Sequence, residues 1–336
     1  MSETLAAPSA QPAPVALTRP AALASVAATL PEGAVTNAPI AARLGVTEDW
    51  IVERTGVRER RVATGEQTLV ELATEAARKA AADAGIAPGE IDLVLAATMS
   101  HDRLTPNLAP LVAAAIGADR AGAFDVGGAC SGFMGALAMA AGQVESGRAD
   151  AVIVLGADQM TRLIDPADRS TAALFGDGAG AVAVVPGRDG ALGIGPVALG
   201  QDGSRGDLVH ADRASGILRM EGQDTFREAV RRLTEVTVSA VAAAELELGD
   251  IDAFVYHQAN VRILRSVGNR LKLPPERVVE CISRYGNTSA ASIPIALADA
   301  TESGLLTPGG RALLGAFGGG LTWGASVIEW GVANAA

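Results

Sequence analysis

The chain has 336 residues, of which 49% are hydrophobic and 19% charged, enough for one large domain or two medium ones. Its formal net charge of −11 argues against a general nucleic-acid binder, which needs a broad basic surface to contact phosphates. Two cysteines cannot form a disulfide framework and the first residues lack a basic signal-peptide segment, so we expect a cytoplasmic protein.

A Pro/Ala-rich leader at residues 1–20 has no hydrophobic periodicity and is predicted to be disordered. Beyond it, buried strands alternate with helices. An Ala-rich run at 69–85 ends at a glycine and predicts a helix with a glycine C-cap. A continuous apolar run at 91–99 predicts a strand that is covered on both faces.

An uncharged stretch at 126–144 is nominally long enough to span a membrane. It contains five glycines and a glutamine and has little Leu or Ile. We therefore interpret it as a helix that is apolar on all sides inside a soluble protein, and we expect no membrane association.

The rest of the chain continues the alternation of apolar strands and helices. Strands are predicted at 149–158, 178–186, 251–256, 311–316 and 323–330, with helices near 223–246 and 289–303. Such an alternation predicts an α/β fold with a mainly parallel sheet.

The two halves of the chain show a weak internal repeat. The segment at 89–100 resembles the segment at 249–260, and each follows an Ala-rich helix. Each half later has a small-residue helix that ends in Glu-Ser-Gly, at 145–147 and at 302–304. Aligning these endings places Cys130 opposite Asn287, which predicts two related helix N-termini, one carrying a thiol and one an amide.

Cys130 follows an apolar strand and two glycines at the predicted start of a helix, in the string DVGGACSGF. Unpaired N–H groups and the helix dipole at such a position would lower the thiol pKa and favour a nucleophilic thiolate. A free cysteine can equally be a small buried hydrophobic side chain. We therefore treat Cys130 as a candidate nucleophile.

Other polar residues follow predicted strands or precede helices. His257 lies at the carboxyl end of a strand, where open α/β sheets gather ligands, although the backbone could equally satisfy it. Asn287 lies in a Gly-flanked loop that enters a helix, so it could be an N-cap. Cys281 is expected in a buried strand, and His101 and His210 are expected on the surface. No metal site is predicted.

Two Gly-rich strings, FGDGAGA and AFGGGLTWG, lack the GK[ST] ending of a phosphate-binding loop. Together with DVGGACSGF, HQAN and GNTSAAS, however, they resemble the β-ketoacyl-acyl-carrier-protein synthase III family of the thiolase superfamily, over about residues 21–331. The string EDWIVERTGVRERR at 48–61 matches as well. The resemblance implies a homodimer and the thiolase fold, with two βαβαβαββ halves, 21–187 and 188–336, in a five-layered α/β/α/β/α sandwich.

The resemblance also implies a chemistry. Cys130 would take an acyl group from acyl-CoA as a thioester, with its own N–H and that of Gly319 as the oxyanion hole. His257 and Asn287 would hold the thioester carbonyl of malonyl-acyl carrier protein during decarboxylation. The carbanion would then attack the acyl group and start fatty-acid or polyketide synthesis. Coenzyme A and phosphopantetheine thioesters are substrates in this scheme, and no cofactor is expected.

The family's coenzyme A site implies further residues. Trp50 and Arg162 match the pair that sandwiches the adenine, a sensible use of aromatic and guanidinium faces. Arg54, Phe226 and Asn260 match positions along the pantetheine tunnel. Without the resemblance, Trp50 would be interpreted as a packing residue and Arg162 as a solvated loop charge.

The resemblance is less exact at the acyl pocket. Phe317 matches the aromatic residue beside the nucleophile, but Thr105 stands where acetyl-preferring members carry a bulky aromatic that reaches across the dimer. With the shortened segment at 200–220 near the pocket's cap, this suggests a branched or longer primer. Carrier-protein docking is predicted at a basic cluster, Arg227, Arg262, Arg265 and Arg270.

Three alternatives stay open. A non-elongating acyltransferase of the same fold would use His257 as a general base to move an acyl group to an alcohol or amine. A papain-like hydrolase also has Cys, His and Asn in this order, but Cys130 lacks its CGSCW-type context. A non-catalytic binding protein would be expected to lose one of the three polar residues.

Overall fold

The computed structural model describes residues 19–65 and 67–334. The predicted disordered leader, residues 1–20, lies outside the described residues except for its last two. Of these two, Arg19 donates a hydrogen bond to the carbonyl oxygen of Val144 at 2.9 Å.

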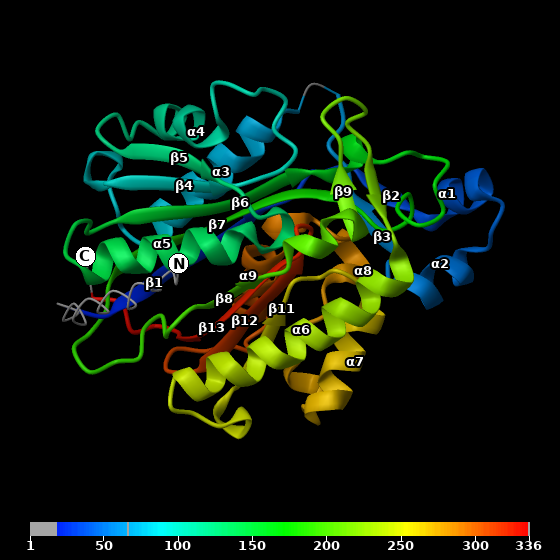
Figure 1. The fold of residues 1–336 in the computed structure, drawn as a ribbon. Coiled ribbons are helices and arrows are strands. Elements are labelled where there is room, and N and C mark those ends of the chain that lie inside the picture. The colour runs from blue at the N-terminus through cyan, green and yellow to red at the C-terminus, as the bar shows by residue number, and fades with distance from the viewer. Residues whose placement is uncertain (1–18, 66, 335–336) are drawn as a thin grey trace, which may run out of the picture.

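Two mixed β-sheets form the framework (Figure 1). The first has the strand order β1–β7–β6–β4–β5, in which the β6–β4 and β4–β5 pairs are parallel. The second has the order β11–β12–β13–β8, in which the β11–β12 pair is parallel. The strands are β1 (Ala21–Thr29), β4 (Leu93–Ala97), β5 (Gly122–Val126), β6 (Val152–Gln159), β7 (Asp177–Pro186), β8 (Ala198–Gln201), β11 (Ala253–Tyr256), β12 (Arg311–Gly318) and β13 (Thr322–Glu329).

The prediction of a mainly parallel sheet is therefore wrong. The β1–β7, β7–β6, β12–β13 and β13–β8 pairs are all antiparallel. Helices cover both faces of each sheet, so antiparallel strands such as β7 also carry unbroken apolar runs. The apolar run reports burial on two faces and not strand direction.

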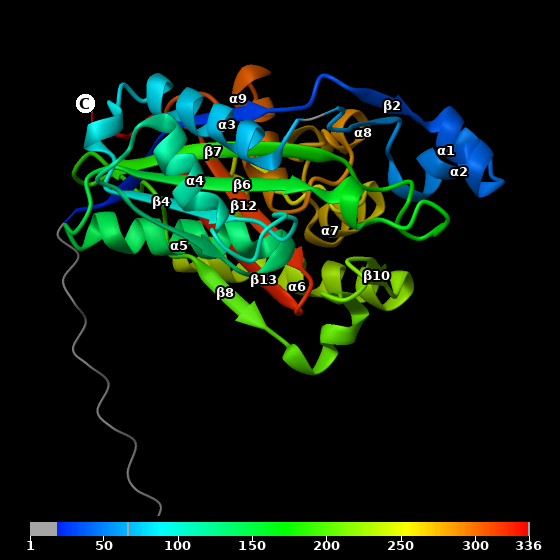
Figure 2. The same cartoon turned by 90° about the horizontal axis from the view of Figure 1, so that it is seen from above.

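Helices form three layers around the two sheets (Figures 1 and 2). Helices α3 and α4 cover the outer face of the first sheet, α5 and α9 lie between the sheets, and α6 and α7 cover the outer face of the second. This arrangement is the expected five-layered thiolase sandwich. The helices are α3 (Leu69–Asp83), α4 (Leu108–Ile116), α5 (Gly132–Glu145), α6 (Gly222–Ala243), α7 (Val261–Leu271) and α9 (Ser292–Glu302).

Small side chains let these layers approach closely. Helix α3 begins with a capping box between Thr68 and Glu71, and its Ala76, Ala77 and Ala80 are fully buried against the first sheet. The uncharged stretch at 126–144 forms the end of β5, a short turn and most of α5, which is buried between the sheets. No helix within the described parts of the chain is long and apolar enough to cross a membrane.

Both halves repeat the same local plan. The turns η1 (Pro88–Glu90) and η5 (Leu248–Asp250) lead into β4 and β11, and the turns η2 (Ala129–Ser131) and η7 (Ser289–Ala291) lead into α5 and α9. The first residues of η2 and η7 share a left-handed backbone, with φ of 47° and 51°. Helix α5 has 14 residues and α9 has 11, so the alignment from the helix ends is wrong. The turns place Cys130 opposite Ala290 and not opposite Asn287.

Two excursions from the sandwich lie at one end of the molecule (Figure 1). One contains β2 (Ala34–Thr36), α1 (Asn37–Leu44), α2 (Glu48–Thr55) and β3 (Glu59–Arg61), and the other is the hairpin of β9 (Val209–Ala211) and β10 (Leu218–Met220). Cys281 is buried as expected, but it precedes the short helix α8 (Ile282–Tyr285) and does not lie in a strand. Its N–H is held by the side chain of Gln258 at 2.9 Å.

Candidate active site

A cavity of about 630 Å³ lies between the sandwich and the two excursions. Cys130, His257 and Asn287, which are far apart in sequence, all line it, together with Phe317 and Gly319. The remaining walls come from α2, α6, α7 and the β9–β10 hairpin. The three candidate groups therefore share one space.

Cys130 lies in η2, half-buried, against the end of β12. A Cβ added to Gly318 would lie 2.9 Å from the backbone nitrogen of Cys130, so only glycine allows this close approach. Gly318 precedes Gly319, whose backbone also lines the cavity. The two backbone segments expected to form the oxyanion hole are thus packed side by side.

The thiol of Cys130 differs electrostatically from the expectation. Burial raises its pKa to about 11, the neighbouring Ser289 hydroxyl opposes this, and the charge of Asp158 raises it further. The prediction of a lowered thiol pKa is therefore wrong. Cys130 lies in a 3-10 turn before α5 begins, where loss of water outweighs the favourable field of the helix.

His257 follows β11 and is fixed by its own backbone. Its N–H donates to the carbonyl oxygen of Gly315 at 2.7 Å, and the residue is 1% exposed. Burial lowers the pKa of the imidazole to about 3, so the ring is neutral at physiological pH and carries one N–H. Within the described structure, its Nδ1 atom has no hydrogen-bond partner. An imidazole with so low a pKa is a weak base, and its remaining N–H can still donate a hydrogen bond.

Asn287 is anchored to the segment before β7. Its N–H donates to the Leu174 carbonyl at 2.9 Å, and its carbonyl accepts from the Gly176 N–H at 3.0 Å. The side-chain Oδ1 accepts from the Ser289 N–H at 2.9 Å, while Nδ2 donates to the carbonyl oxygen of Ala259 at 3.3 Å. The amide oxygen and one N–H of the NH2 group are therefore committed to the backbone, which leaves the second N–H of this cavity-lining residue for a ligand.

Four of the residues assigned to the coenzyme A site line the cavity, namely Trp50, Arg54, Phe226 and Asn260. The Arg54 guanidinium lies 4.5 Å from the Trp50 ring centroid. Asn260 caps α7 through its Oδ1 and donates from Nδ2 to the Arg54 carbonyl at 2.9 Å. This contact joins α2 to α7 along one wall of the cavity.

Two residues assigned by the resemblance lie away from the cavity. Arg162 pairs with Asp102 through hydrogen bonds of 2.5 and 2.7 Å and does not line the cavity. Thr105 is exposed on the loop after β4, beside Leu104, which is 77% exposed. Within one chain, the structure places neither residue at the acyl pocket or beside Trp50.

The four arginines of the predicted docking cluster lie on two helices that pack against each other, α6 and α7. Arg262 lines the cavity, with its guanidinium 5.3 Å from the Phe226 ring centroid. Arg227 pairs with an aspartate at 3.1 Å, Arg265 pairs with a glutamate at 3.7 Å, and Arg270 lies in the last turn of α7. Of the four arginines, only Arg262 reaches the cavity.

The β9–β10 hairpin contributes residues that the sequence did not indicate. His210 is partly exposed, in line with its prediction as a surface residue, and it also lines the cavity. No local pattern marks it, because its position depends on the hairpin folding across the cavity. The other unanticipated lining residues are mainly apolar, with one cation: Met99, Met160, Arg169, Leu218 and Met220. Among the described residues, no group of three His, Cys, Asp or Glu side chains could hold a metal ion.

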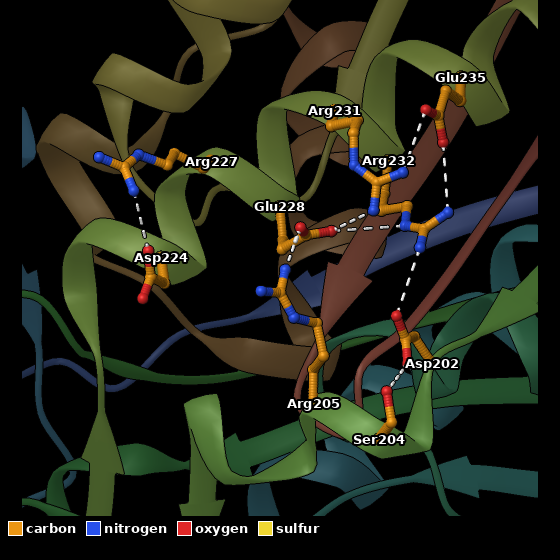
Figure 3. A network of polar contacts seen from close by, with 9 residues as sticks. All are labelled: Asp202, Ser204, Arg205, Asp224, Arg227, Glu228, Arg231, Arg232 and Glu235. Atoms are coloured by element: carbon orange, nitrogen blue, oxygen red, sulfur yellow. Dashed lines mark hydrogen bonds and ion pairs between the residues drawn. The ribbon is translucent and has the colours of Figure 1, made fainter.

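A charge network connects the hairpin to α6 (Figure 3). Glu228 on α6 has a side chain that is only 10% exposed, and it pairs with Arg205 of η4 (Gly203–Leu208), the turn that leads into β9. It also pairs with Arg231 at 2.6 Å, and Arg232 pairs with Asp202 at 3.5 Å. The β9–β10 hairpin, which lines the cavity, is therefore connected to α6 by ion pairs through η4.

A cysteine nucleophile candidate, a neutral imidazole and a carboxamide converge in a duplicated five-layered fold. This combination defines an acyl-transferring condensing enzyme of the thiolase fold.

Comparisons with known proteins give the same result. Residues 124–203 match the family model described as 3-Oxoacyl-[acyl-carrier-protein (ACP)] synthase III, and residues 241–330 match the model of its C terminal part. The synthase III of Granulibacter bethesdensis is 42% identical over 316 residues, which cover 91% of this chain and 98% of that protein. The chain belongs to the 3-oxoacyl-(acyl-carrier-protein) synthase III family.

Solved structures also resemble this chain. The synthase III of Aquifex aeolicus has a TM-score of 0.89 and 39% identity, covering 92% of this chain and 100% of that one. The priming β-ketosynthase of the R1128 polyketide biosynthetic pathway has a TM-score of 0.90 and 38% identity, covering 97% and 100%. The second of these structures is thus named for priming in a polyketide pathway.

Proposed function

We propose that this protein condenses an acyl-CoA primer with malonyl-acyl carrier protein, with loss of CO2, through an acyl thioester on Cys130. The reaction initiates fatty-acid or polyketide synthesis. The observation that carries this proposal is the convergence of Cys130 with two neutral N–H donors, His257 and Asn287, in one cavity. The names of the relatives and of the priming β-ketosynthase agree with it.

In the first half-reaction, the Cys130 sulfur attacks the acyl-CoA carbonyl carbon and coenzyme A leaves. The carbonyl oxygen becomes negatively charged in the tetrahedral intermediate. The backbone N–H groups of Cys130 and Gly319 are held together by the close contact at Gly318, and they can donate to that oxygen without rearrangement.

In the second half-reaction, malonyl-acyl carrier protein loses CO2 and negative charge develops on its thioester oxygen. The His257 ring and the Asn287 amide each offer an N–H to this oxygen. The resulting carbanion attacks the acyl-Cys130 carbonyl and releases the β-ketoacyl product. Loss of one such donor typically slows a reaction by about a hundredfold or more.

The site disfavours the non-elongating acyltransferase. That reaction requires His257 to remove a proton from an alcohol or amine, but an imidazole with a pKa of about 3 is a weak base at physiological pH. Nδ1 of His257 also lacks, within the described structure, the hydrogen-bond partner that orients the base in hydrolytic Cys–His sites.

Intact-protein mass spectrometry after exposure to a panel of acyl-CoAs tests the assignment. Cys130→Ala should show no acyl-enzyme with any of them. His257→Ala and Asn287→Ala should acylate like the wild type but condense about a hundredfold or more slowly. Undiminished condensation by either variant would refute the assigned roles, and the panel also identifies the accepted primer.

The substrates proposed here are thioesters of coenzyme A and phosphopantetheine, and no cofactor is proposed. Arg54, Arg169 and Arg262 line the cavity and supply positive charge for the phosphates of coenzyme A in an otherwise acidic chain. The stacking of adenine between Trp50 and Arg162 stays a prediction, and it requires Arg162 to leave Asp102. The cytoplasmic location stays a prediction from the sequence.

Arg262 is the member of the basic cluster best placed to meet the acidic carrier protein, because it lines the cavity. Charge reversal, Arg262→Glu, should weaken carrier-protein binding, and wild-type binding should weaken with salt. Binding that is insensitive to both changes would contradict docking at this site.

A homodimer is proposed through β5. This strand is an edge of the first sheet, it is partly exposed along its length, and Phe124 on it is 41% exposed. The exposed Leu104 and Thr105 lie on the loop that follows the neighbouring strand β4. An exposed strand edge with apolar side chains favours pairing with a second copy.

A further inference from the structure

Asp158, near the end of β6, is a buried carboxylate with no role in the mechanism above. It is 0% exposed. One oxygen accepts hydrogen bonds from the Thr98 hydroxyl at 3.1 Å, the Met99 N–H at 2.9 Å and the Ser100 hydroxyl at 2.7 Å. The other oxygen accepts from the Ala290 N–H at 3.1 Å, which leaves it further acceptor capacity. All four donors are neutral, and burial raises the pKa of this carboxyl group.

Ser289 connects this carboxylate to Cys130. It is the first residue of η7, fully buried, and its φ of 51° is a backbone conformation that residues other than glycine rarely adopt. Its turn lies directly on β6, since a Cβ on Gly156 would come 2.1 Å from the carbonyl oxygen of Ala290. A strained, buried serine is thereby held between the nucleophile turn and the acid.

The Ser289 hydroxyl acts on both neighbours. It lowers the pKa of the Cys130 thiol and also that of the Asp158 carboxyl, while the charge of Asp158 raises the thiol pKa. Yet within the described structure this hydroxyl completes no hydrogen bond of ordinary geometry. A buried hydroxyl with no other partner, in a turn that packs against both the nucleophile turn η2 and strand β6, is placed to pass a proton between the thiol and the carboxyl group.

We propose that Asp158 is the terminal proton acceptor for Cys130 during acylation and that the Ser289 hydroxyl relays the proton. The inference rests on the proposed function. As the bond from the Cys130 sulfur to the acyl carbon forms, the S–H bond breaks and its proton passes to Ser289, whose own proton passes to Asp158. When the carbon–sulfur bond to coenzyme A breaks, the proton returns along this path to the leaving sulfur. Coenzyme A leaves as a thiol, and Asp158 is again a carboxylate.

Three ionisable groups face this junction: Cys130 from η2, Asp158 from β6 and His257 from the end of β11. Burial keeps the thiol protonated, with a pKa of about 11, so acylation needs a base. Burial also raises the pKa of Asp158, which makes it a better proton acceptor than an ordinary carboxylate. His257 is neutral throughout the physiological range, because burial lowers its pKa to about 3.

The pH dependence of acylation in a single turnover tests the relay. The probe is whichever of acetyl-, butyryl- and octanoyl-CoA labels the wild type fastest, and acylated protein is counted after rapid quenching. The wild-type rate should rise with pH only until Asp158 has ionised and should then level off, because the base is the Asp158 carboxylate and not the free thiolate. Asp158→Asn and Ser289→Ala should be at least about tenfold slower at pH 7 and gain about tenfold per pH unit, as the thiol ionises without help.

Two controls separate the relay from a structural effect. Thr98→Val removes one donor to the other oxygen of Asp158, and its rate should still level off as the pH rises. The rate of His257→Ala should also level off, because this ring is not the base. If Asp158→Asn fails to fold by circular dichroism, Ser289→Ala carries the test alone.

A rate in Ser289→Ala that levels off at the same pH as the wild type, whether at the wild-type rate or lowered equally at every pH, would overturn the relay. A rate in His257→Ala that keeps climbing with pH would overturn it as well, since His257 would then be the base. Failure of the wild type to acylate with any probe would instead refute the proposed function.

Discussion

Burial of the His257 ring couples the stability of the fold to pH. The pKa of this imidazole is about 3 in the folded protein and 6.5 in the unfolded chain. Between these values the unfolded chain binds more protons, so the stability contributed by the neutral ring is complete above about pH 6.5 and is lost as the pH falls. The loss is about 1.4 kcal/mol per pH unit.

Urea unfolding of the wild type and His257→Gln at pH 7 and pH 5 checks this coupling. The wild type should lose about 2 kcal/mol more than the variant over this interval. Other buried acids, including Asp158, are common to both proteins and cancel in the comparison. An equal loss in the two proteins would show that the ring is not held neutral.

The contact between Gly318 and the nucleophile turn should be intolerant of a methyl group. In Gly318→Ala, the new Cβ would lie 2.9 Å from the Cys130 nitrogen and 3.0 Å from the Ser131 nitrogen, so these segments must separate. Displacing an oxyanion donor should slow acylation at least about tenfold in a rapid-quench assay. Gly142→Ala on α5 is the matched control, because its Cβ would meet nothing within 4 Å. Equal rates in the two variants would contradict the assigned contact.

Single residues could be predicted where their function depends on a local string. Cys130, His257 and Asn287 lie beside strand ends or glycines that mark them in the sequence, and the structure gathers all three in the cavity. Asp158 and Ser289 could not be found in this way, because the roles proposed for them depend on contacts between the two halves. The pKa of Cys130 was mispredicted for the same reason: burial is set by the tertiary fold.

At the scale of elements, the ion pairs of Glu228 should anchor the β9–β10 hairpin, which lines the cavity, to α6 (Figure 3). Glu228→Gln removes the charge that holds Arg205 of η4 and also Arg231. We expect a loss of about 1–2 kcal/mol in the free energy of unfolding, because the arginines are partly solvated. Looser anchoring of the hairpin should raise KM for acyl-CoA more than it lowers kcat.

Glu235→Gln is the matched control for this network. Glu235 pairs with Arg231 and Arg232 on its own helix, and the network gives it no partner in η4. Its KM should therefore stay at the wild-type value, and limited proteolysis should cut the β8–β10 region faster only in Glu228→Gln. Equal changes in both variants would mean that α6, and not the hairpin, is affected.

Elements of the core could be predicted and those around the cavity could not. The strands and helices of the sandwich carry long apolar or Ala-rich runs, and the predicted segments agree with β4, β6, β7, β11, α3 and α6 within a few residues. Strands β9 and β10 have three residues each, too few for a pattern. Strand direction could not be predicted either, because strands that are buried on both faces carry the same apolar runs in parallel and antiparallel pairs.

For the whole molecule, the edge strand β5 predicts the oligomeric state. Phe124→Asp places a charge on the exposed edge and should convert a dimer into a monomer in sedimentation velocity. The exposed Val238→Asp on α6, which lies on the far sheet's outer face, is the control and should stay dimeric. A wild-type monomer, or a dimer in both variants, would contradict pairing through β5.

The duplication was visible in the sequence, but its register was not. The matching strings before β4 and β11 reveal two copies of one plan, and the two sheets share it. The helix endings misled the alignment because α5 is three residues longer than α9, and a length change inside a helix leaves its ends recognisable. The shared backbone conformation of η2 and η7 gives the correct alignment of the two halves, which the side chains of these turns no longer show.

Each half of the duplicated chain holds the reactive group of the other half in place. Gly318 of the second half packs against Cys130 of the first, and Leu174 and Gly176 of the first half hydrogen-bond to the backbone of Asn287. Recombination between family members is constrained by this exchange. A chimera that joins the first copy of one enzyme to the second copy of a related enzyme combines two contact surfaces that evolved separately. Whether the chimera is active therefore depends on how well these two surfaces fit, more than on the core of either parent.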